Sequence, residues 1–176
     1  MIDNDSQTKV EEKAALSEYD KKVLEIKNSL DPAELVTNGF LSLVLDVRPG
    51  ILAGKFKSLS GEQVRVINKE VAKFANPKYE TYDNPVTGKR ERMIVVDPPT
   101  KQEIDDYATY LMLAQALLEV NGESLGDDPR ERYQKLHKLD STLVTALYRK
   151  LLQFLTAVRL LFPDEDQEKQ LEALKN

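Results

Sequence analysis

The feature that most constrains this fold is a long apolar pattern near the C-terminus, between Asp140 and Pro163. Apolar residues recur there every three or four positions, which predicts a helix with one broad apolar face. Asp140 or Ser141 is suited to cap its start, and Pro163 to end it. The apolar positions are Leu143, Val144, Leu147, Leu151, Phe154, Leu155, Val158, Leu161 and Phe162. Other elements must cover such a face, so we expect this helix at the centre of the core.

A second helix should precede it and share that core. Asp128-Pro129 is a typical helix start, because Asp caps the first turn and Pro is favoured at the first helical position. Tyr133, Leu136 and Leu139 follow on this segment. The predicted core residues are Leu136, Leu139, Leu143, Leu147, Leu151, Phe154 and Val158.

Two segments have the alternation of β-hairpins. Residues 41–47 alternate with a period of two, Pro49-Gly50 is a turn signal, and residues 51–57 could be the partner strand. Further along, residues 79–82 and 92–96 flank a turn-rich stretch, which predicts a second hairpin. We interpret Tyr79 and Tyr82 as strand residues, since aromatic side chains suit a half-buried sheet.

Helix signals fill the remaining length. Short capping motifs start helices at Ser60 with Gln63 and at Thr100 with Glu103. The second of these helices should run through Ile104 to Val120 and end at a C-cap formed by Asn121-Gly122. The predicted class is α+β and mostly helical, a helical bundle with one or two small antiparallel β-hairpins.

A narrow apolar stripe lies near the N-terminus on an otherwise charged segment. It consists of Leu16, Tyr19, Val23, Ile26 and Leu30. Such a stripe can pack on its own domain or on another chain, and both alternatives stay open. The candidate partner-binding residues are Leu16, Tyr19, Val23 and Ile26. Asp31-Pro32 begins a new short helix, so we divide the chain into a tail with a separable amphipathic helix (1–31), an α+β domain (32–162) and an acidic C-terminal tail (163–176).

Charge argues against binding to nucleic acid, and hydropathy argues against a membrane span. Residues 1–31 and 163–176 each carry a net charge of −3, and the total of −5 leaves +1 for residues 32–162. Binding to nucleic acid needs clustered positive charge, and the group formed by Lys89, Arg90 and Arg92 is too small to provide it. No apolar run approaches the length of a membrane span, and the N-terminus does not resemble a signal peptide.

The sequence offers little chemistry. There is no cysteine and a single histidine, His137, which excludes thiolate metal sites and multi-histidine relays. No phosphate-binding glycine motif is present, and no nucleophile elbow surrounds Ser141. We therefore predict no catalytic residue, no metal, no cofactor and no small-molecule substrate.

Two arginines in the first turn of a predicted helix leave a choice. The helix dipole disfavours cations at that position, so Arg130 and Arg132 need partners. They could form a local ion-pair network with Asp127, Asp128 and Glu131, or one of them could reach across to brace another helix or subunit.

The order of these segments resembles a family of small tail and base-plate assembly proteins of tailed bacteriophages, which includes tail assembly chaperones and base-plate hub assembly factors. Three features support the resemblance, which covers about residues 50–76 and 104–162. They are Lys57 to Glu62 opening a helix, an apolar helix closing on Glu119 to Gly122, and the succession Arg132, Leu136, Leu139, Leu143, Leu147 and Phe154.

The resemblance implies a non-enzymatic virion assembly protein, either a chaperone or a tail or base-plate component. Its partners would be other phage structural proteins or further copies of itself. It would be located in the host cytoplasm during assembly, with possible retention in the virion tail. A helical adaptor or inhibitor that binds a host protein is the main alternative, and a small enzyme with an unrecognised site is a second one.

Overall fold

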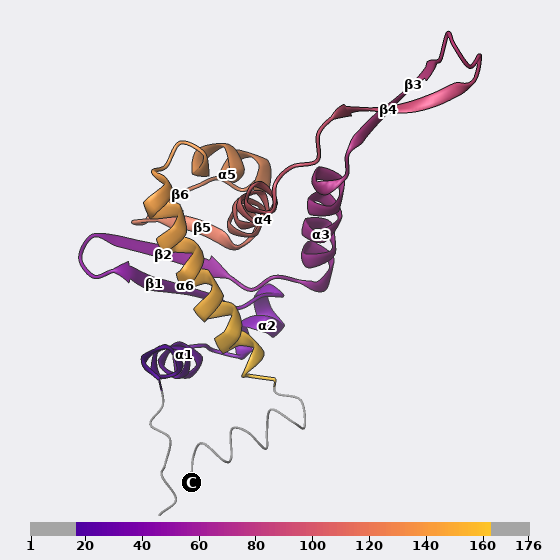
Figure 1. The fold of residues 1–176 in the computed structure, drawn as a ribbon. Helices are drawn as coiled ribbons and strands as arrows, with labels where there is room; N and C mark the ends of the chain where they lie inside the picture. Colours follow the sequence, from indigo (N-terminus) through magenta and orange to yellow (C-terminus); the bar gives the residue numbers. More distant parts are fainter. Residues whose placement is uncertain (1–16, 163–176) are drawn as a thin grey trace, which may run out of the picture.

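A computed structural model describes residues 17–162 of the chain, which form six helices and two antiparallel sheets (Figure 1). In chain order the elements are α1 (Glu18–Asn28), α2 (Ala33–Asn38), β1 (Ser42–Arg48), β2 (Leu52–Lys57), α3 (Gly61–Ala75), β3 (Lys78–Asp83), β4 (Arg90–Val96), α4 (Lys101–Ala116), β5 (Leu117–Val120), β6 (Glu123–Ser124), α5 (Pro129–Leu136) and α6 (Ser141–Arg159). The predicted α+β class is confirmed. The predicted helical bundle is not, because strands β2 and β5 take part in the core.

The helix starts follow the local sequence. Ser60 and Thr100 form capping boxes with Gln63 and Glu103, as expected. Asp140 caps α6 by accepting a hydrogen bond from the backbone N–H of Thr142. Among the described residues, no helix has both the length and the apolar content needed to cross a membrane.

The larger sheet has the strand order β1-β2-β5-β6, with every neighbouring pair antiparallel. Strand β2 lies inside this sheet and passes close to its neighbours at Gly54. A Cβ atom at Gly54 would lie 2.9 Å from the Phe56 ring and 3.1 Å from a methyl group of Leu117. A glycine at this position therefore lets β2 and β5 pack closely.

The prediction that one helix continues to Val120 is wrong. Helix α4 ends at Ala116, and residues 117–120 form strand β5 instead. Asn121 and Gly122 have φ angles of 51° and 81°, the positive values of a type I′ hairpin turn, and they connect β5 to β6. The Asn121 side chain also accepts a hydrogen bond from the backbone N–H of Ala53 and donates one to the carbonyl of Ile51. These contacts fix β5 against the edge of β2, so the Asn-Gly pair acts as a turn and not as a helix cap.

The core lies between this sheet and helix α6. Phe56 of β2 and Phe154 of α6 are both fully buried, with ring centroids 6.3 Å apart. Of the predicted core residues, Leu136, Leu147, Leu151 and Phe154 are fully buried, and Leu139, Leu143 and Val158 are partly buried against the same cluster.

Helix α1 packs on α6 and contributes to the same core. Val23 and Ile26 are only 3% and 5% exposed, and Leu30 is buried beside them. The tails at 1–16 and 163–176 lie outside the described residues. The proposed boundary at residue 31 stays untested, but the shared core favours treating residues 17–162 as one folded unit.

The second sheet projects from this body. Helix α3 packs beside α4, and the hairpin of β3 and β4 extends from the ends of these two helices into solvent (Figure 1). We call residues 78–96 the arm. Its strands pair in register from Tyr79–Ile94 to Asp83–Arg90, with an irregularity next to Lys78.

Candidate functional site

The structure changes the interpretation of the N-terminal stripe. The prediction that Val23 and Ile26 contact a partner is corrected, because both side chains are buried inside their own chain against α6. Tyr19 is 45% exposed, and its hydroxyl lies 3.4 Å from the Thr156 hydroxyl. Leu16 lies outside the described residues. Val23 and Ile26 are therefore not accessible to a partner in this conformation.

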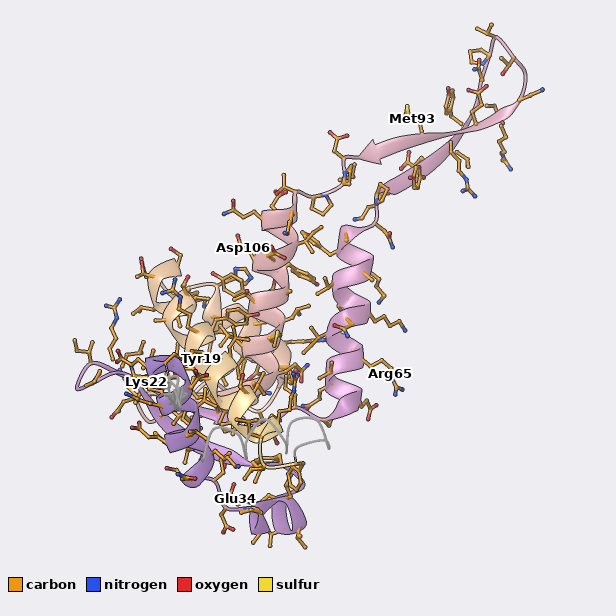
Figure 2. All side chains as sticks on the ribbon, turned by 60° about the horizontal axis from the view of Figure 1, so that its bottom comes forward. Tyr19, Lys22, Glu34, Arg65, Met93 and Asp106 are labelled. Atoms are coloured by element: carbon orange, nitrogen blue, oxygen red, sulfur yellow. The ribbon has the colours of Figure 1, made fainter. Side chains whose placement is uncertain are left out.

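The arm is exposed along most of its length. Every residue of β3 is exposed, and so are Met93 and Val96 on β4. Tyr79 and Tyr82 lie on a strand, as expected, but they are 54% and 41% exposed, so the sheet that carries them is not half-buried. Figure 2 shows Met93 on the arm, well separated from the side chains of the body. An isolated two-stranded hairpin is marginally stable in water, so this arrangement is typical of an element that gains contacts from a partner.

The two faces of the arm differ in chemistry. Residues that lie opposite each other on paired strands share a face, so Glu80 lies beside Met93 and Tyr82 beside Glu91. Arg90 and Arg92 are two positions apart on β4, which places both on the other face. Arg90 forms an exposed ion pair with Asp83 at 3.6 Å. In the part of the chain that the structure describes, Lys89 and Arg92 have no carboxylate within ion-pair distance.

The carboxylate of Glu91 organises the tip of the arm. It accepts hydrogen bonds from Asn84 Nδ2 at 3.0 Å, from the Thr87 hydroxyl at 2.9 Å and from the Tyr82 hydroxyl at 3.1 Å. These bonds, led by the one from Asn84, lower the pKa of Glu91. The Asn84 side-chain carbonyl also accepts a hydrogen bond from the backbone N–H of Val86 at 2.8 Å. Lys89 and Arg90 therefore follow a turn whose conformation is fixed by side-chain hydrogen bonds.

We expect the tip of the arm to loosen in acid. The pKa of Glu91 is lower in the folded arm than its unfolded value of about 4.3, so its stabilising contribution is fully present above that pH. The contribution is lost as the pH falls through the folded pKa. Backbone amide NMR shifts of residue 84 and residues 86–90 should report this loss. A Glu91→Gln variant should show little pH dependence at these amides, and an equal response in both proteins would contradict the role of Glu91.

A cleft of about 590 Å³ lies at the root of the arm, where α3, α4 and the hairpin meet. Phe74 and Tyr107 form part of its lining, and their rings stack with centroids 4.4 Å apart. Val96, Pro98 and Pro99 add apolar surface. The charged residues of the lining are Glu70, Lys73, Lys78, Asp97 and Glu103. The Glu70 and Lys73 side chains form an ion pair with each other at 2.6 Å. The cleft therefore suits an apolar side chain more than a charged ligand.

Arg132 braces the body and is not part of an ion-pair network. It is 3% exposed; its Nε donates to the Ala114 carbonyl at 2.6 Å and its Nη1 to the Gly126 carbonyl at 3.0 Å. Burial lowers the pKa of Arg132, while the charges of Asp127 and Asp128 act in the opposite direction. Of the two alternatives for Arg132, the second therefore holds, because this arginine reaches across to another helix, α4. Its function is to connect α5 to the junction between α4 and β5.

The described residues contain no arrangement that suggests catalysis. The His137 ring stacks on Tyr110 with centroids 4.0 Å apart, and Tyr133 packs against both rings. Within residues 17–162, no three His, Asp or Glu side chains gather to hold a metal ion. A second hollow of about 310 Å³ contains Arg48, Ser141 and Arg149, and these side chains are exposed. The arm and its root cleft are therefore the candidate site.

Comparison with known proteins adds no assignment. No protein-family model, curated protein or solved structure matches this chain. The resemblance to phage tail and base-plate assembly proteins stays a prediction from the sequence.

Proposed function

We propose that this chain is a non-enzymatic assembly protein of a tailed phage, acting in the host cytoplasm as a chaperone or as a tail or base-plate component. The observation that carries the proposal is the arm, a two-stranded hairpin that projects from a packed body with exposed side chains on both faces. The body supplies rigidity and the arm supplies contact surface. The sequence resemblance supports the phage setting.

The physical basis is the set of unpaired strand edges. In a two-stranded sheet each strand has one free edge of backbone N–H and C=O groups, and such an edge can pair with a strand of another chain. Tyr79, Tyr82 and Met93 add side chains of the kind that are enriched at interfaces. A structural protein that docks there would order the arm, and the arm would shield the docked surface of that protein from solvent.

Site-specific cross-linking tests this function. A photoreactive amino acid at Tyr82 should cross-link, during infection, to a tail or base-plate protein. The matched control places the same group at Tyr19, which is similarly exposed on α1 and should give little product. A cross-link from Tyr82 to a host protein would instead support the adaptor or inhibitor alternative. Equal products from both positions would contradict docking through the arm.

A further inference from the structure

We infer that the arm binds the acidic C-terminal segment, residues 163–176, of a second copy of this chain. The inference rests on the proposed function of the arm as a docking element and names its occupant. Three observations carry it, namely the charge of the arm, the apolar cleft at its root and the spacing of matching residues in the C-terminal segment.

The charges are complementary. The arm carries four cations, including Lys89, Arg90 and Arg92 at its outer end, and three carboxylates. Asp83 pairs with Arg90, and Glu91 keeps its negative charge while it accepts hydrogen bonds from three uncharged side chains. Four cations and three carboxylates give the arm a net charge of +1, and Lys89 and Arg92 at its outer end form no ion pair among the described residues. Residues 163–176 carry a net charge of −3, with Asp164, Glu165 and Asp166 in succession.

The lengths also match. An extended strand rises about 3.3 Å per residue, so the six steps from Arg90 to Val96 span about 20 Å from the tip to the root cleft. Six steps from Glu165 to Leu171 in the C-terminal segment also span about 20 Å when extended. One segment can therefore place its carboxylates at the basic tip and a leucine in the cleft that contains Phe74 and Tyr107. Pairing with a free strand edge would hold the segment along the arm.

The geometry favours a second copy over the same chain. Helix α6 packs against α1, and both figures show its C-terminal end beside α1 and α2, away from the arm. A segment from another copy reaches the arm without crossing its own body. Each contact joins the arm of one copy to the C-terminal segment of another. The first copy keeps its own segment free and the second keeps its own arm free, so association can continue into open chains or close into rings.

The test uses full-length chains in sedimentation velocity at increasing concentration. Wild type should exceed the mass of a dimer at low salt and dissociate at high salt, because exposed charges are screened. One variant reverses the arm with Lys89→Glu and Arg92→Glu, and another reverses the segment with Asp164→Lys and Asp166→Lys. Each variant alone should bind itself at least about tenfold more weakly, and a mixture of the two should associate again because the charges are exchanged.

Matched controls separate the specific contact from net charge. The double variant Lys21→Glu and Lys138→Glu changes the net charge by the same amount as the arm variant, but at exposed positions of the body. It should leave association unchanged. Leu171→Asp should weaken association, whereas Gln170→Asp should have less effect. A wild-type chain that stays monomeric, or a segment variant that associates normally, would overturn this inference. Cross-linking from Tyr82 to a virion protein would then still support the proposed function, so the two failures are distinguishable.

Discussion

Replacing Phe154 by Ala should lower the free energy of unfolding by about 3–5 kcal/mol, the cost of removing a fully buried aromatic side chain. Phe154 lies between α6 and the sheet, next to Phe56. Removal of the Phe154 ring would leave a cavity between α6 and the sheet. Since 1 kcal/mol shifts the melting temperature of a domain of this size by about 2–4 °C, thermal melts should show a decrease of roughly 10 °C.

Positions on the same helix provide the control. Leu152 lies on α6 but is partly exposed, so Leu152→Ala should cost less than about 1 kcal/mol. Leu147 and Leu151 are fully buried, and their replacement by Ala should cost about 2–5 kcal/mol each. If Phe154→Ala and Leu152→Ala melted at the same temperature, α6 would not be the centre of the core.

Sequence reasoning succeeded where a local signal and a wide apolar face agreed. The start of α6 depends on Asp140, whose side chain caps the first turn, and its buried face repeats with the helical period. The capping boxes at Ser60 and Thr100 likewise depend on residues three positions apart. Such signals need no knowledge of distant segments.

It failed at β5 because the local pattern suits two structures. Leu117, Leu118 and Val120 continue the apolar residues of α4, and an Asn-Gly pair can end a helix or turn a hairpin. The free edge of β2 decides between them, because β5 pairs with it from Gly54 to Phe56. This contact joins residues more than 60 positions apart, so no short window of sequence contains it.

The location of the candidate site was missed for a related reason. The stripe containing Val23 and Ile26 shows that one face of α1 must be covered, but not whether its own chain covers it. In β3, by contrast, one face has Lys78, Glu80 and Tyr82 and the other has Tyr79, Thr81 and Asp83, so neither face is apolar. The absence of an apolar face was a usable signal that this hairpin is not packed on the core. What the sequence lacked was any sign that the arm leaves the body at the ends of α3 and α4.

The brace formed by Arg132 gives the second large expected effect. Arg132→Met keeps an unbranched chain of similar length, which limits lost packing, but it removes the guanidinium group that donates to the carbonyls of Ala114 and Gly126. The Ala114 carbonyl would lose a charged donor in a buried setting and the Gly126 carbonyl in a partly buried one, so the free energy of unfolding should fall by about 2–4 kcal/mol.

Two neighbouring changes make this test specific to the brace. Arg132→Lys keeps the positive charge but not the fork of donors, and should recover only part of the loss in a urea titration. Arg130 is exposed on the same helix, so Arg130→Met should change stability by less than about 0.5 kcal/mol. If Arg132→Met were as stable as Arg130→Met, the two hydrogen bonds would not hold α5 to the junction of α4 and β5. The C-terminal end of α4 would then be fixed by the packing of Leu113 and Leu117 alone, both of which are fully buried.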